Sequence, residues 1–190
     1  DVSNPEQVQA MVEKCIETYG RIDVLHNNVA IIDTNRLVEM TEENWDQVMA
    51  VNVKSIFLAC KFCIPHMEKQ GGGAIVNISS GAALSGMEGW SLYCAAKAGI
   101  EHFIRTIALE QANNPFPINA INISPGLIDT GMQASIRSAA QTDFPRVQDF
   151  VGFKAEGALR SPALVAGAVV AIVASDPAPG SRHEVADYVP

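Results

Sequence analysis

Short apolar segments with the character of β-strands alternate with amphipathic helical segments along this 190-residue chain. The strand-like segments cover residues 22–26, 74–78 and 118–123. Between them, apolar residues recur every three or four positions, which is the spacing of one face of a helix. Such alternation predicts a parallel sheet with helices on both faces. We therefore expect an α/β fold with a doubly wound parallel sheet, folded as one domain over residues 1–190.

Capping and helix-breaking residues predict where the first helices begin and end. Asn4, followed by a proline, begins a first helix that Gly20 ends. A longer helix is expected from about residue 41 to residue 69, and its pattern turns Trp45 and Phe57 toward the core.

The last third of the chain has a weaker pattern. Residues 131–160 read as a loop-rich lid beside a substrate pocket, and loops of this kind set specificity. Ser161 and the proline after it begin a helix that runs to about residue 174. Residues 180–188 are expected to form a last strand.

The charge balance excludes several classes of partner. Acidic residues outnumber basic ones 21 to 13, and the net charge is −8. Nucleic acids and anionic membrane surfaces would be repelled by this charge. No uninterrupted apolar run approaches the roughly 20 residues that a bilayer span needs. The first residues lack the features of a signal peptide, so we expect a cytoplasmic protein that binds small molecules.

The cysteines and histidines do not predict a metal site. Cys60 and Cys63 have the spacing of a redox or metal-binding pair, but they lie inside a helical pattern and no second pair follows. We interpret them as ordinary helix residues. The four histidines are scattered without the spacing of ligands, so no metal is expected.

Small and polar residues follow each of the three predicted strands. They occupy residues 27–30, 79–81 and 124–127. In parallel sheets the ligand binds beyond the carboxyl ends of the strands. The sequence therefore places a binding site where these three segments meet.

Tyr93 and Lys97 are the strongest candidates for chemistry. They are four positions apart in a helical pattern and so share one face. A free phenol has a pKa near 10 and exchanges protons poorly at neutral pH, but a nearby ammonium lowers that pKa. Ser80, at the end of a strand, would hydrogen-bond the same substrate oxygen. We expect the three groups to move a proton to or from that oxygen.

These three residues, at these spacings, resemble the active-site signature of the short-chain dehydrogenase/reductase family. Further segments resemble family motifs in the family's order: Asp1-Val2, Asn27-Asn28-Val29-Ala30, Val51-Asn52-Val53 and the run from Pro125 to Thr130. The resemblance implies a Rossmann-like fold and an oxidoreductase. Its members transfer a hydride between NAD(P)(H) and a carbonyl or alcohol substrate.

The resemblance assigns catalytic roles to four residues. It implies that Tyr93 is the proton donor or acceptor and that Lys97 lowers the Tyr93 pKa and binds the nicotinamide ribose. Ser80 is implied to orient and polarise the substrate carbonyl. Asn52 is implied to hold a water that links Lys97 to solvent.

The resemblance also implies two sets of binding residues. Residues expected at the NADP or NAD cofactor are Asp1, Val2, Asn27, Val29, Tyr93, Lys97, Pro125, Gly126, Ile128 and Thr130. Residues expected at the substrate are Ser80, Tyr93, Leu127 and Asp187.

The C-terminal third is similar to one subgroup, the sepiapterin reductases and bacterial benzil reductases. That similarity implies NADPH rather than NADH, and a substrate with vicinal dicarbonyl or α-hydroxycarbonyl groups. Asp187 falls near the position of the carboxylate that grips the pterin in sepiapterin reductases. The two long helices, expected over about residues 41–69 and 90–112, resemble the family's pairing surfaces, which implies a homodimer or homotetramer.

The chain departs from the family pattern at its front. The family begins with a strand, a glycine-rich turn and a helix that binds the pyrophosphate, and roughly 60 residues of this kind are missing here. Gly81, Gly86 and Gly89 read as a substrate-side loop, not as that turn. We expect the strand at Ile22 to become an open apolar edge, with a large exposed apolar patch beside it.

This departure leaves the function open. The chain is expected to be the C-terminal part of a longer reductase, or a short form without cofactor affinity. Two alternatives to a reductase follow: a non-catalytic binding protein derived from the family, or a cofactor-free lyase or isomerase that uses Tyr93.

Overall fold

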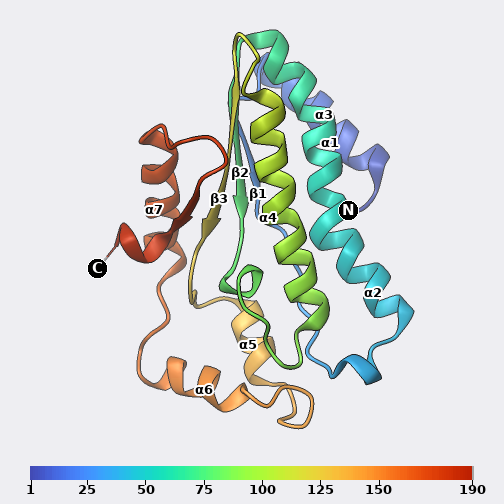
Figure 1. Cartoon of the computed structure of the whole chain (residues 1–190), viewed down its shortest axis with the longest axis vertical. Helices are drawn as coiled ribbons and strands as arrows, with labels where there is room; N and C mark the ends of the chain where they lie inside the picture. The colour runs from blue at the N-terminus through green and yellow to red at the C-terminus, as the bar shows by residue number, and fades with distance from the viewer. Residues whose placement is uncertain (190) are drawn as a thin grey trace.

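A computed structural model describes residues 1–189. Its centre is a parallel sheet whose four strands lie in chain order, β1 (Val24–Asn27), β2 (Gly73–Ile78), β3 (Ile118–Ser124) and β4 (Arg182–Glu184) (Figure 1). Parallel neighbours need a crossover connection, and helices supply it between each pair of strands. The predicted doubly wound α/β architecture is confirmed.

Helices cover both faces of the sheet (Figure 1). One face carries α1 (Pro5–Tyr19), α3 (Ser55–Gln70) and α4 (Ser91–Gln111), and the other carries α7 (Pro162–Ala174). Successive strand residues point to opposite faces, so Ile75 packs under α3 and α4 while Val76 packs under α7. Both strand residues are fully buried. The two cores together fix the carboxyl ends of the strands.

Local capping fixes the helix ends where the sequence predicted them. The Asn4 side chain accepts a hydrogen bond from the Gln7 amide at 2.9 Å, and Gly20 ends α1 with a φ of 78°. Ser161 caps α7 in the same way, by accepting a hydrogen bond from the Leu164 amide at 3.2 Å. These ends were predictable because each cap involves residues three or four apart.

The predicted helix over residues 41–69 forms one continuous segment with a π-helical turn inside it. It consists of α2 (Glu42–Met49), the π turn Ala50–Lys54 and α3. Over an 18-residue window its mean hydropathy is 1.5, so by length and composition alone it is long and apolar enough to cross a membrane. Charged residues interrupt it, so it contains no long run of apolar residues alone. The buried side of α3 packs in the core against α1, α4 and the sheet.

The predicted inward direction of Trp45 and Phe57 on this segment is wrong. Trp45 is 48% exposed and Phe57 is 44% exposed. Helical spacing identifies an apolar stripe but does not say what covers it. Here the stripe is wider than the face that packs on the sheet, so part of it faces outward.

The segment expected to be a loop-rich lid or pocket segment contains two helices, so its predicted loop-rich character is wrong, although Met132 and Gln133 do line the pocket. They are α5 (Gly131–Arg137) and α6 (Val147–Ala155). Both pack on an aromatic cluster in which the rings of Trp90 and Phe144 stack with centroids 4.9 Å apart. Such pairing adds to the apolar burial. It gives residues 131–160 a fixed position beside the sheet.

Gly89 brings the loop before α4 against this segment. Its φ is +81°, and a Cβ atom there would lie 2.5 Å from the Asp143 carbonyl oxygen. Only glycine satisfies both constraints. This loop therefore serves packing on the substrate side, not phosphate binding.

Strand β1 is an edge strand of the sheet, as expected, but it begins at Val24 and not at Ile22. Ile22 is buried, and Val24 is the first exposed residue of the edge, at 47%. On the α7 side an apolar groove of about 370 Å³ runs between β1, β2 and α7. Val170, on α7, is exposed beside it. The predicted apolar patch therefore lies along this groove.

Candidate active site

A cleft of about 450 Å³ opens at the carboxyl ends of the strands. It lies where the strand-end rule places a ligand. Its lining brings together three segments that are far apart in sequence: residues 28–30 after β1, residues 78–80 at the end of β2, and residues 125–130 after β3. Of the predicted site residues, those lining this cleft are Val29, Ser80, Tyr93, Lys97, Pro125, Gly126, Ile128 and Thr130.

Helix α4 presents Tyr93 and Lys97 to this cleft. Their spacing of four residues puts both on the buried side of the helix. The Lys97 Nζ lies 5.7 Å from the centroid of the Tyr93 ring. It also donates a hydrogen bond to the Ile78 carbonyl oxygen at 2.7 Å, which fixes the ammonium between helix and strand.

The pKa values of the two groups differ from the sequence expectation. Burial raises the pKa of Tyr93, and hydrogen bonding with the Ser80 side chain opposes that rise. Burial also lowers the pKa of Lys97 to about 8. The expected lowering of the Tyr93 pKa by Lys97 is therefore not found. The reason is desolvation, which is the largest cause of the shift in both groups.

Ser80 lines the cleft and also a second, neighbouring cavity. That cavity has a volume of about 310 Å³ and is also lined by Tyr93 and Leu127. Its other lining residues are mostly apolar and include Ile32, Met87, Trp90, Met132, Ile136 and Phe150. A substrate carbonyl between Ser80 and Tyr93 would therefore place its substituent against apolar and aromatic side chains.

Asn52 lies in the π turn and is buried. Its side-chain oxygen accepts a hydrogen bond from the Ile31 amide, and its NH₂ group donates one to the Ile31 carbonyl, both at 2.8 Å. The side chain thus anchors the segment that follows β1, which lines the cleft.

Four other predicted residues lie at the edge of the site or away from it. Val2 and Asn27 line a smaller neighbouring cavity of about 130 Å³, together with Val29. Asp1 is exposed and accepts hydrogen bonds from Ser3. Asp187 is also exposed, in the short 3₁₀ turn Val185–Asp187. Neither acid lines the cleft or the cavity beside Ser80.

Cys60 and Cys63 pack inside α3, as interpreted from the sequence. Both are buried, and burial raises the pKa of Cys60 to about 12 and that of Cys63 to about 11. Thiols with such values carry no thiolate at neutral pH.

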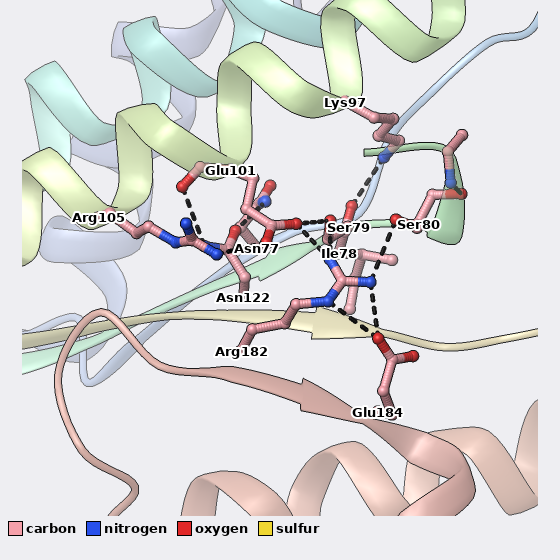
Figure 2. A network of polar contacts seen from close by, with 11 residues as sticks. Asn77, Ile78, Ser79, Ser80, Lys97, Glu101, Arg105, Asn122, Arg182 and Glu184 are labelled. Atoms are coloured by element: carbon pink, nitrogen blue, oxygen red, sulfur yellow. Dashed lines mark hydrogen bonds and ion pairs between the residues drawn. The ribbon is translucent and has the colours of Figure 1, made fainter. Parts of the chain in front are cut away.

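Sequence reasoning missed several residues around the site. Gln133 is buried and lines both cavities, and Glu184 lines the cavity beside Ser80. Glu101 and Arg182 form a buried ion pair beside Ser80 (Figure 2). A signal for Glu101 existed, because it continues the four-residue spacing from Tyr93 through Lys97. No local pattern predicts Arg182.

The donors in the cleft fit part of a nicotinamide cofactor. Lys97 carries a buried ammonium for which the described residues supply one hydrogen-bond acceptor, so further donors remain for ribose hydroxyls. Pro125, Gly126, Ile128 and Thr130 line the same cleft. These residues would hold the nicotinamide and its ribose.

The fold and the cleft define a doubly wound α/β protein in which a tyrosine, a lysine and a serine line one cleft at the carboxyl ends of the strands. The model of the family described as short chain dehydrogenase matches residues 1–141. The chain belongs to this short-chain dehydrogenase family.

Individual relatives agree with this assignment. A 3-oxoacyl-[acyl-carrier-protein] reductase of Thermotoga maritima is 39% identical over 148 residues, which are 77% of this chain and 59% of that protein. A benzil reductase of Bacillus subtilis is 30% identical over the whole chain, which spans 80% of its length. A solved structure of an ElxO variant with NADPH bound has a TM-score of 0.80 and 26% identity, and covers 97% of this chain and 74% of its own.

Proposed function

We propose that this protein reduces a carbonyl compound with NADPH or NADH, and that Tyr93 gives the proton. The observation that carries the proposal is the convergence of Tyr93, Lys97 and Ser80 on one cleft at the carboxyl ends of the strands. A bound reduced nicotinamide supplies a hydride for the carbonyl carbon. The remaining requirement is a proton for the carbonyl oxygen, and the chain's own residues meet it.

Proton donation follows from the protonation state of Tyr93. Because burial raises the pKa of its phenol, Tyr93 carries its proton at neutral pH. The hydroxyl gives this proton to the carbonyl oxygen as the C–O double bond becomes a single bond, and Ser80 donates a hydrogen bond to the same oxygen. The product is an alcohol, and Tyr93 is left as a phenolate. Lys97 then stabilises this anion until a proton from solvent restores the phenol for the next turnover.

The apolar cavity beside Ser80 points to the class of substrate. We propose a vicinal dicarbonyl or α-hydroxycarbonyl compound with an apolar or aromatic substituent. The aromatic lining from Trp90 and Phe150 supports this substituent. The full-length similarity to a benzil reductase supports the same class. NADPH is the proposed cofactor, supported by its presence in the related solved structure.

The proposal is tested with the purified protein as its gene encodes it. We expect NADPH or NADH to be oxidised in the presence of benzil and other vicinal dicarbonyls, and fluorescence titration to show binding of the cofactor. Aliphatic ketones without a second oxygen serve as the matched comparison and should react more slowly. Absence of binding of either cofactor would favour a non-catalytic protein. Conversion of the carbonyl substrate without cofactor would favour a lyase or isomerase.

We also propose a homodimer or homotetramer in the cytoplasm. The outward-facing Trp45 and Phe57 support pairing through α2 and α3, as does a surface groove that Phe57 lines together with Met49 and Val53. The four cysteines, none paired with another among the described residues, support a reducing compartment. Light scattering of the purified protein tests the oligomer, and a monomer at micromolar concentration would contradict it.

A further inference from the structure

A charged cluster lies beside Ser80 and Lys97, two residues that line the cleft (Figure 2). Its centre is Glu101 on α4, whose side chain is 4% exposed and forms an ion pair with Arg182 on β4. The same carboxylate accepts a hydrogen bond from the Ser79 hydroxyl at 2.5 Å. The Glu101 backbone carbonyl accepts another from the Asn122 side chain at 3.1 Å. The cluster therefore joins the helix that carries Tyr93 and Lys97 to three strands of the sheet.

Arg182 contacts the end of β2 at two points. One guanidinium nitrogen donates to the Ser79 hydroxyl at 3.0 Å, and the other donates to the Ser80 carbonyl oxygen at 3.2 Å. Glu184 pairs with the outer side of the same guanidinium at 2.7 Å. A planar guanidinium with several donors is suited to such a fixed, many-sided contact.

Three successive residues at the end of β2 are thus held by charged groups. Lys97 binds the carbonyl of Ile78, Glu101 and Arg182 bind the hydroxyl of Ser79, and Arg182 binds the carbonyl of Ser80. This leaves the Ser80 hydroxyl facing the cleft, where it accepts a hydrogen bond from the Ala82 amide at 3.2 Å. The position of that hydroxyl therefore depends on a backbone segment that the cluster fixes.

A buried ion pair contributes little to net stability, because desolvation offsets most of its Coulomb attraction. Its geometric effect is larger, since each charge has several directional partners. We propose that the Glu101–Arg182 pair is a positioning element that fixes the Ser79–Ser80 segment and thereby sets the Ser80 hydroxyl against Tyr93. For its effect on turnover, this inference rests on the proposed function.

The first test is the variant Arg182→Met, which removes the contacts to Ser79 and Ser80. We expect kcat to fall about 10- to 100-fold, as for other small misplacements of a catalytic group. The cofactor affinity should stay nearly unchanged. Arg105→Met is the matched control, because Arg105 also pairs with Glu101, at 2.9 Å, but is 42% exposed and does not reach the β2 end. This control should keep its kcat.

A double-mutant cycle with Ser80→Ala distinguishes an effect of Arg182 on the position of Ser80 from a general disruption of the folded structure. If Arg182 acts through Ser80, Arg182→Met lowers kcat in the wild-type background and has little further effect in the Ser80→Ala background. An equal loss in both backgrounds, or no loss in the wild type, would overturn the proposal. Should Arg182→Met fail to fold because the buried Glu101 carboxylate loses one of its two arginine partners, the variant Glu101→Gln/Arg182→Met carries the same cycle.

Hydrogen exchange of the Ala82 amide gives a readout that needs no turnover. This amide donates to the Ser80 hydroxyl, so its exchange reports where that hydroxyl lies. We expect faster exchange in Arg182→Met, no change in Arg105→Met, and no further increase when Arg182→Met is added to Ser80→Ala. Unchanged Ala82 exchange in Arg182→Met would refute the positioning role. A wild-type protein that reduces no carbonyl would instead refute the proposed function, and the exchange result would still stand.

Discussion

We expect the variant Tyr93→Phe to lose at least about 100-fold in kcat, while its affinity for the nicotinamide cofactor stays nearly unchanged. The change removes one oxygen atom and keeps the ring, which packs 5.6 Å from the ring of Trp90, centroid to centroid. Packing is thus preserved and only the proton donor is lost. Steady-state kinetics together with a fluorescence titration of the cofactor separate the two effects.

Tyr19→Phe is the control for this result. Tyr19 is 74% exposed at the end of α1, and its hydroxyl lines none of the cavities around the site. The control should behave as the wild type. Full turnover in Tyr93→Phe would mean that the proton comes from another group.

The second large effect concerns the pH dependence of stability and the variant Lys97→Met. Burial lowers the pKa of Lys97 from its ordinary 10.5 to about 8 in the folded state. Between these two values the unfolded chain binds a proton that the folded chain does not. Stability therefore rises with pH across this window, and below it the folded protein carries the full cost of a buried charge. From about pH 7 to about pH 10 the wild type should gain up to about 3 kcal/mol relative to Lys97→Met.

Chemical denaturation at several pH values measures this difference in the free energy of unfolding. Lys61→Met is the control, because Lys61 is an exposed lysine on α3 and its removal should leave the pH dependence as in the wild type. Parallel pH curves for the wild type and Lys97→Met would show that Lys97 keeps an ordinary pKa in the folded protein.

The parts of the fold that depend on local interactions were predictable from the sequence. The ends of α1 and α7 followed from caps within one turn. The site followed from strand ends, because parallel strands bring their carboxyl ends to one edge of the sheet. Tyr93 and Lys97 share a face for the equally local reason that four residues make about one helical turn.

The remaining features depend on contacts between distant residues. Arg182 reaches Glu101 across 81 positions of sequence, and no periodicity predicts such a contact. The exposure of Phe57 was missed because apolar residues have the same helical spacing whether their side of the helix packs in the core or faces outward. The helices α5 and α6 were missed because their apolar residues pack around the aromatic cluster, which the sequence does not show as one unit.

The pKa values were the least predictable part of the site. Spacing correctly placed the Lys97 ammonium near the Tyr93 ring. The pKa values of both groups, however, are set mainly by how deeply each group is buried. That depth depends on the entire packing of α4 against the sheet. The consequence is a Tyr93 phenol that keeps its proton at neutral pH.

Transfer of isotope label is the most direct measurement of the proposed chemistry. The protein is incubated with benzil and reduced nicotinamide cofactor that carries deuterium at C4, and the alcohol product is analysed by mass spectrometry. We predict one deuterium atom on the new carbinol carbon in the wild type, and at least about a 100-fold slower appearance of that product in Tyr93→Phe. An alcohol without deuterium, or equal rates for both proteins, would contradict hydride transfer at a site where Tyr93 supplies the proton.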